Sequence, residues 1–240
     1  MEENRNRVWG LIPTILWSLL VVCLFVSTQI IALLIYVNNA TGSISAESVS
    51  AMSNNGDALS YATISTLFVC GLAVLGIVKL KKNSIGNYIG LNTPGIKQLL
   101  AWVTIVILLV MLSDFITYVL GRKVVPEFMI KTYSSATNPF LLFISFLIAA
   151  PIFEELFFRG FILSSLKESF IGVTGSIIIS AAAWASIHLQ YDLYGIFTIF
   201  FIGVVLGFAK IKTNSIFTTI VMHSVMNFIA LTEVAIHMLG

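Results

Sequence analysis

Charged residues are scarce in this sequence. Asp, Glu, Lys and Arg make up 10% of its 240 residues, whereas soluble domains carry about a quarter. The few charges separate long apolar runs, the pattern of a chain that crosses a bilayer repeatedly. The net charge is only +2 and no long basic cluster occurs, so nothing favours nucleic acid as a partner. This composition excludes a soluble globular domain and predicts an integral protein of the lipid bilayer.

Cysteine is also scarce. Cys23 and Cys70 each lie within an apolar run, so we interpret them as small packing residues that form neither a disulfide nor a Cys-x-x-Cys metal site. A cleaved signal peptide is not expected either. The uncharged run at 8–37 is much longer than the apolar core of about 7–15 residues in a signal peptide. We therefore expect the first apolar segment to be a retained span.

Long apolar runs are abundant, and each run of roughly twenty residues predicts one membrane-spanning helix. The fold class is therefore all-α, a polytopic transmembrane helical bundle of about seven spans (six to eight). No internal repeat is visible. The predicted spans cover approximately 9–36, 61–79, 99–120, 140–163, 172–189, 194–210 and 215–238.

The distribution of Lys and Arg predicts how these spans are oriented, because short cytoplasmic loops carry an excess of both residues. The loops at 38–60 and 190–193 contain neither, while the third loop is an exception with three. We therefore expect a cytoplasmic N-terminus and an external C-terminus. The basic residues on the predicted cytoplasmic side are Arg5, Arg7, Lys79, Lys81, Lys82, Lys97, Lys167, Lys210 and Lys212.

Ionisable side chains are costly inside a bilayer, so those within predicted spans are candidates for function. The first group is Pro-Ile-Phe-Glu-Glu-Leu-Phe-Phe-Arg-Gly at 151–160. Glu155 and Arg159 lie one helical turn apart, in the order that favours an ion pair. Glu154 points about 100° away and has no such local partner, which suits a general base acting on water. The alternative is a helix end whose charges lie in water.

Two further groups follow in later spans. Trp184 and His188 come after an Ala/Ser-rich run that favours close helix packing, although His188 could instead be an interfacial residue. His223 and Asn227 share one face of the last predicted span. They could donate hydrogen bonds to a developing oxyanion, bind a neighbouring helix, or supply a metal ligand through the imidazole. Asp114, in the third predicted span, receives no role.

Taken in this order, Glu-Glu-x-x-x-Arg, an aromatic residue followed by x-x-x-His, and His-x-x-x-Asn resemble the CPBP family, the CAAX prenyl endopeptidases and bacteriocin-processing enzymes, also known as Abi. The resemblance covers approximately 139–235. One departure is Trp184, which stands where the family usually has Phe. The resemblance implies an intramembrane protease, a peptide hydrolase. Its catalytic helical core would be 139–240, with 1–138 forming N-terminal transmembrane helices of the same membrane domain.

The resemblance also implies roles for individual residues. Glu154 would act as the general base on a water, assisted by His188. His223 and Asn227 would bind the carbonyl oxygen as it becomes an oxyanion.

The same resemblance implies three supporting residues and raises the possibility of a zinc ion in the site. Glu155 and Arg159 would hold the helix geometry, and Trp184 would wall a dry pocket. Members of the family have been described both as zinc enzymes and as metal-free glutamate proteases. Zinc normally takes three protein ligands plus water, and Glu154, His188 and His223 could supply them. No His-Glu-x-x-His is present, however, so we favour the metal-free alternative and leave zinc open.

The expected substrate is a peptide or a membrane protein. Because bacteria generally lack prenylated proteins, peptide maturation or bacteriocin self-immunity in a bacterial cell membrane is preferred to CAAX processing. One alternative is a non-catalytic membrane partner that regulates another membrane protein. Another is a transporter with Asp114, Glu154 and His223 as a proton relay, but the paired broken helices of carriers are not seen.

The span boundaries and the motifs disagree about depth. The boundaries place Glu154 towards the cytoplasmic end of the fourth predicted span and His188 towards the external end of the fifth. The proposed chemistry needs the two side chains to be close, so we follow the motifs and expect the boundaries to be in error.

Overall fold

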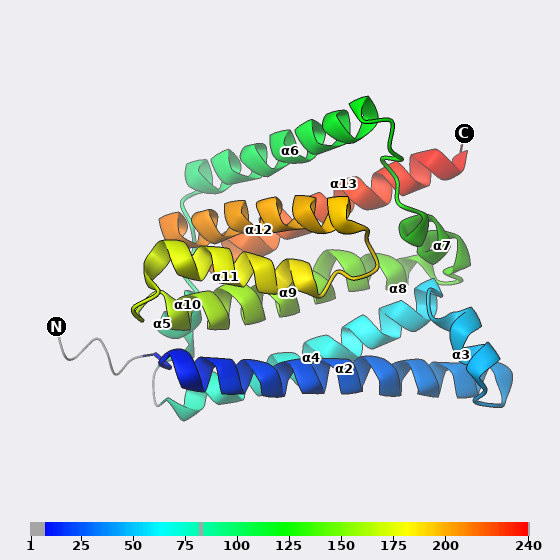
Figure 1. Ribbon diagram of the computed structural model, residues 1–240, viewed down its shortest axis with the longest axis horizontal. Helices are drawn as coiled ribbons and strands as arrows, with labels where there is room; N and C mark the ends of the chain where they lie inside the picture. The colour runs from blue at the N-terminus through cyan, green and yellow to red at the C-terminus, as the bar shows by residue number, and fades with distance from the viewer. Residues whose placement is uncertain (1–7, 82–83, 240) are drawn as a thin grey trace.

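The fold is a bundle of helices that run back and forth between two ends of the molecule (Figure 1). A computed structural model describes residues 8–81 and 84–239, and within these ranges every regular element is helical. Arg5, Arg7 and Lys82, three of the residues used to predict orientation, lie outside the described residues.

The predicted polytopic bundle of about seven spans is confirmed. Within the described residues, six helical stretches are long and apolar enough to cross a bilayer, and a seventh, α11, is shorter. The long stretches are α2 (Leu11–Thr41), α4 (Gly56–Leu80), α6 (Ile96–Val119), the fourth span Pro139–Leu166, α12 (Leu193–Thr213) and α13 (Ile216–Leu239). The shorter one is α11 (Gly172–Ser186).

The fourth span is one continuous helical run of changing geometry. Its α-helical parts are α8 (Pro139–Ile144), α9 (Ala150–Glu154) and α10 (Ser164–Leu166), and its π-helical parts are η1 (Ser145–Ala149) and η2 (Glu155–Leu163). Wider π turns inside α-helices are rare and frequently occur at functional sites. Glu154 and Glu155 therefore lie where the helical geometry changes.

Three short helices connect the spans: α3 (Ala46–Met52), α5 (Ile85–Ile89) and α7 (Glu127–Ser135). The predicted loop at 38–60 contains α3 and the start of α4, because local capping starts two helices there. Ser45 and Ser48 form a reciprocal capping box at α3, and the Asn55 side chain accepts the first backbone N–H groups of α4. Such caps satisfy the free N–H groups of a helix end without any apolar pattern.

The spans form layers around a core that includes the fourth span. α2 and α4 lie side by side along one edge of the bundle, α6 lies along the opposite edge, and the remaining spans lie between them (Figure 1). Phe157, Phe158, Phe161 and Trp184 are nearly inaccessible. Most of α2 is exposed, as expected for a helix whose outer face contacts lipid.

Candidate active site

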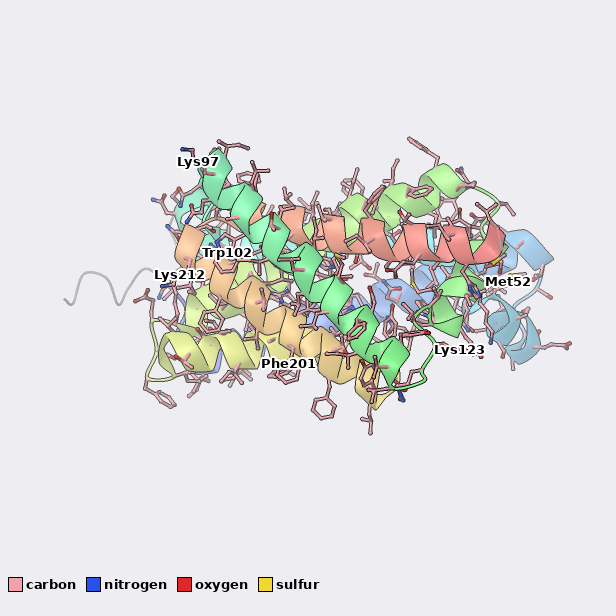
Figure 2. All side chains as sticks on the ribbon, turned by 90° about the horizontal axis from the view of Figure 1, so that it is seen from above. Met52, Lys97, Trp102, Lys123, Phe201 and Lys212 are labelled. Carbon is pink, nitrogen blue, oxygen red and sulfur yellow. The ribbon has the colours of Figure 1, made fainter. Side chains whose placement is uncertain are left out.

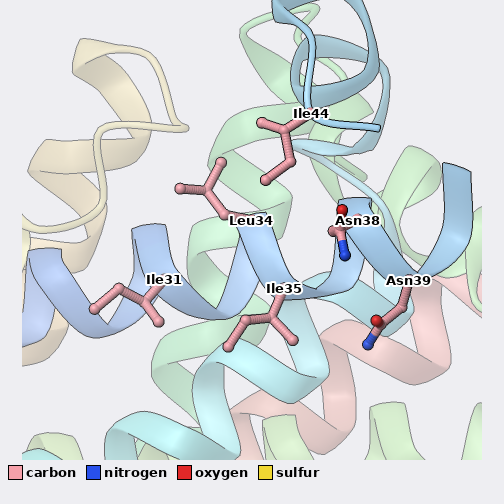
Figure 3. A pocket seen from close by; sticks show the side chains of 6 residues that line it. All are labelled: Ile31, Leu34, Ile35, Asn38, Asn39 and Ile44. Atoms are coloured by element: carbon pink, nitrogen blue, oxygen red, sulfur yellow. The ribbon is translucent and has the colours of Figure 1, made fainter. Parts of the chain in front are cut away.

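A cavity of about 1020 Å³ contains all four predicted catalytic residues. Glu154 of α9, His188 of the turn after α11, and His223 and Asn227 of α13 all line it. A second hollow, of about 260 Å³, lies at the C-terminal end of α2 (Figure 3). Its lining is aliphatic apart from two asparagine amides, so only the larger cavity offers groups for acid–base chemistry.

The register of two neighbouring helices brings Glu154 and His188 to similar depths. Ser180 Oγ donates to the Phe158 carbonyl at 2.9 Å, and Trp184 Nε1 donates to Glu154 Oε2 at 2.5 Å. On each helix, the residue of the second pair lies one helical turn from the residue of the first pair, and in the same direction along the bundle because the two helices are antiparallel. The different depths that the predicted span boundaries implied for Glu154 and His188 are therefore wrong, because the turn that joins the two helices is about equally far from Glu154 and from Trp184.

Glu154 has partners that its own helix does not provide. Its side chain is largely buried, at 14% exposed, and Oε2 lies 3.8 Å from His223 Nε2. The indole of Trp184 does more than wall the pocket, since it donates a hydrogen bond directly to this carboxylate. Within the described residues, Glu154 Oε1 has no hydrogen bond, so this oxygen is free for a water.

Glu155 is the centre of a buried network. The predicted ion pair with Arg159 is present at 2.8 Å, and both side chains are 0% exposed. The same oxygen, Oε1, also lies 3.0 Å from His223 Nδ1. Arg159 donates to the Gly203 carbonyl at 3.2 Å and stacks 4.6 Å from the centre of the Trp184 ring. One carboxylate thus fixes both the guanidinium and the imidazole.

These contacts determine which nitrogen of each histidine carries the proton. His188 Nδ1 lies 2.8 Å from the Trp184 carbonyl oxygen, which can only accept. His223 Nδ1 faces the Glu155 carboxylate, which is paired with Arg159 and also accepts. Both Nδ1 atoms are therefore donors, and each neutral ring has a lone pair on Nε2. At His223 this Nε2 is the atom nearest Glu154.

Asn227 has a structural contact in addition to its predicted role. Its Nδ2 donates to the Phe146 carbonyl at 2.8 Å, and Ser224 Oγ donates to the Leu147 carbonyl at 2.8 Å. Pro151 has no N–H to donate to a carbonyl four or five residues earlier. The missing N–H leaves one carbonyl of the preceding turn without its helical donor, and two side chains of α13 donate to carbonyls of that turn. The second N–H of the Asn227 amide is available to a ligand.

Tyr191 is a cavity residue that the sequence motifs missed. Its ring lies 6.3 Å from that of His188 and 6.1 Å from that of Phe128 in α7. Burial and the negative charge of Glu154 raise the pKa of Tyr191 to about 12, so the phenol is a hydrogen-bond donor at neutral pH. The only signal in the sequence was an aromatic residue three positions after His188.

Asp114 also lines this cavity, together with Glu233 of α13. The two carboxyl groups share a hydrogen bond. Neither side chain belongs to the three motifs.

The residues considered for zinc do not form a three-ligand site in this geometry. Among the described residues, no group of three or more His, Cys, Asp and Glu side chains is arranged to hold a metal ion. The Glu154 oxygen nearest His223 is already bonded to the Trp184 indole. We therefore derive no step through a metal.

One known family resembles the part of the chain that contains this site. Residues 136–229 match the family model described as type II CAAX prenyl endopeptidase Rce1-like, and the matched segment contains all seven predicted site residues. This confirms the resemblance of the matched segment to the CPBP family, a family of intramembrane proteases. The protein is an integral, multi-pass membrane protein. No curated protein and no solved structure matched the chain.

Proposed function

We propose that the protein is an intramembrane endopeptidase in which Glu154 activates water for attack on a peptide carbonyl. The observation that supports this most strongly is the free oxygen of Glu154 in a cavity shared with two imidazoles and an amide. A general base must lie within hydrogen-bond reach of the water that it deprotonates. Both Glu154 and the Nε2 lone pair of His188 can accept from one water and so orient its oxygen.

The reaction then proceeds in two proton-balanced steps. Glu154 takes a proton as the water oxygen bonds to the carbonyl carbon, and the carbonyl electron pair moves onto its oxygen. Collapse of this tetrahedral species breaks the C–N bond, and Glu154 returns the proton to the departing amine. The free N–H of Asn227 stabilises the oxyanion. His223 can donate from Nε2 only when it carries a second proton, and the nearby Glu155 carboxylate balances that charge.

Two substrate classes fit this chemistry in a bacterial cell membrane. One is a peptide matured by removal of a segment, and the other is a bacteriocin whose cleavage confers self-immunity. We prefer both to CAAX processing, for which the substrates are generally absent from bacteria. The N-terminus is proposed to be cytoplasmic, on the distribution of Lys and Arg.

The test compares new N-termini in membranes of cells that express the wild type, Glu154→Gln or Glu168→Gln. Glu168 is exposed, outside the spans, so its substitution is the matched carboxyl-to-amide control. We expect wild type and Glu168→Gln to generate the same new N-termini. Glu154→Gln should reduce their yield at least about a hundredfold, the contribution of a positioned general base.

His188→Ala and His223→Ala complete the comparison at matched expression. Full cleavage by all three site variants would contradict the peptidase proposal. If all three variants keep the protein's biological effect, the alternative is favoured, a non-catalytic partner of another membrane protein.

A further inference from the structure

The cavity that contains Glu154 opens towards one end of the bundle. Three connecting segments contribute to its lining: 53–54 before α4, 122–126 between α6 and α7, and 190–192 between α11 and α12. All three lie at the end where α2, α6, α11 and α13 finish (Figure 1). Within the described residues, the connections at the other end contribute nothing to the cavity.

Basic residues are concentrated at the opposite end. Figure 2 shows Lys97 and Lys212 at one end of the molecule and Met52 and Lys123 at the other. Within the described residues, the cavity end has three basic side chains in its connections. Two of these are paired with acids, Arg122 with Asp192 at 2.6 Å and Lys123 with Glu127 at 2.9 Å. The described basic residues of the other end are Lys79, Lys81, Lys97, Lys167, Lys210 and Lys212.

Together, the direction of the cavity and the asymmetry of charge indicate on which side of the membrane the cavity opens. The end richer in Lys and Arg is cytoplasmic, so the cavity opens on the external side. We propose that the substrate reaches Glu154 from the external face, and that it is an exported peptide or the external part of a membrane protein. This inference rests on the proposed peptidase function.

The chemistry of the lining agrees with a polypeptide that enters from water. Side chains at the mouth include the polar or charged Asn54, Arg122 and Gln190 beside a short apolar stretch at 124–126, while Phe153 and Ile202 lie among the residues contributed by the spans. A polar mouth admits a hydrated chain, and an apolar interior excludes bulk water from the reacting bond. A cytoplasmic C-terminal segment, such as a prenylated CAAX peptide, would lie on the wrong side of the membrane.

Cysteine labelling tests the face directly. In a background with Cys23→Ser and Cys70→Ala, single cysteines replace Gln190 and Asn54 at the mouth, or Glu168 and Phe170 at the opposite end. All four native side chains are exposed, and each cysteine is first shown to react in permeabilised membranes. With a membrane-impermeant maleimide on intact cells, we expect the two mouth positions to react and the other two to remain unmodified. The reverse pattern, or labelling of all four, would overturn the proposal.

Activity measured on the same variant separates this inference from the proposed function. Intact cells carrying Gln190→Cys are compared before and after labelling, by the yield of the new N-termini. A bulky adduct at the mouth should reduce cleavage at least about tenfold. Undiminished cleavage after complete labelling would overturn access through this mouth but leave the peptidase proposal intact. Absence of cleavage by the unmodified wild type would overturn the peptidase, whereas the labelling pattern would still report the face.

Discussion

At the scale of single residues, Glu155 determines the geometry of the site without lining its cavity. Its side chain is inaccessible, and Oε1 receives both Arg159 and His223. A buried charge is tolerated only when it is paired and hydrogen-bonded. The ion pair therefore keeps the Glu155 carboxylate ionised, and that carboxylate keeps the proton of the neutral His223 ring on Nδ1. Orientation of the His223 lone pair towards Glu154 follows from this chain of contacts.

Removal of the Arg159 side chain should therefore destabilise the protein strongly. Arg159→Ala leaves an uncompensated carboxylate in the bundle, and breaking a buried pair in this way costs about 3–5 kcal/mol. Lys123→Ala is the matched control, because Lys123 and Glu127 are also four residues apart but are mostly exposed. Thermal unfolding in detergent should show a large loss for the first variant and little change for the second. Equal effects would contradict the inferred importance of burial.

Tyr191→Phe isolates one hydroxyl. The contacts of the Tyr191 ring with His188 and Phe128 remain, while a donor facing the cavity is lost. We expect kcat to fall about tenfold, the equivalent of one hydrogen bond of about 1.4 kcal/mol. Because burial and the charge of Glu154 raise the pKa of Tyr191 to about 12, the phenol stays protonated up to about pH 10. The ratio of the two rates should therefore be constant between pH 6 and about pH 10, and a ratio of one would remove Tyr191 from the mechanism.

Chelation addresses the metal alternative. Since no three-ligand group is formed among the described residues, we expect dialysis against a chelator to leave cleavage by the purified wild type unchanged. Loss of activity that added Zn²⁺ restores would contradict this. Bound metal is measured in the same samples by elemental analysis, with Glu154→Gln as the control for specific retention.

The sequence predicted local relations well and distant ones poorly. The Glu155–Arg159 pair followed from a spacing of four residues on one helix. The contact between Glu155 and His223 joins positions 68 residues apart, and no spacing rule specifies which carboxylate a distant imidazole meets. The roles of Glu154, His188, His223 and Asn227 are still predictions, although the structure places them around one cavity.

At the scale of elements, the fourth span carries Glu154 at the point where its helical geometry is irregular. Pro151 lies between two π-helical segments, three residues before Glu154. A wider turn rotates the residues that follow it relative to those before it, by about 100° for one inserted residue. The direction in which Glu154 points thus depends on the helix geometry near Pro151.

Pro151→Ala should separate stability from activity. Alanine restores an N–H and favours a regular helix, since proline in a helix interior costs about 3 kcal/mol. We expect an unchanged or higher melting temperature, with cleavage reduced at least about tenfold as Glu154 turns away. Pro139→Ala is the control, because a proline in the first turn of a helix leaves no further donor missing. Full activity in Pro151→Ala would show that the irregularity is not needed.

The spans themselves were predictable because bilayer thickness fixes their length. Boundaries were not, because they depend on caps such as Asn55 and not on hydrophobicity. α11 shows the consequence, since it ends at Ser186, short of His188. The apparent conflict in depth arose from measuring along each span separately. The Ser180–Phe158 hydrogen bond gives the missing register, and that bond could not be deduced from either helix alone.

At the scale of the whole molecule, the N-terminal helices hold the start of the fourth span. Asp57 of α4 is 4% exposed and accepts the backbone N–H groups of Thr137 and Asn138 at 3.0 and 3.1 Å, as well as the Thr137 hydroxyl. Further along, the rings of Phe25 in α2 and Phe153 are stacked 6.0 Å apart. The division at 138/139 is still a prediction, but contacts of this kind tie both sides of it together.

Asp57→Ala tests this coupling at a distance from the cavity. It removes the acceptor of three hydrogen bonds at the start of the fourth span, each of which contributes about 0.5–1.5 kcal/mol. We expect a lower melting temperature and also less cleavage, because the helix that carries Glu154 loses its anchor. Asp57→Asn, which keeps one acceptor oxygen, should recover part of both. A double variant with Thr137→Val should lose less than the sum of the single variants, since the two side chains share one interaction. Stability lost with cleavage intact would show that the N-terminal helices support the fold without positioning Glu154.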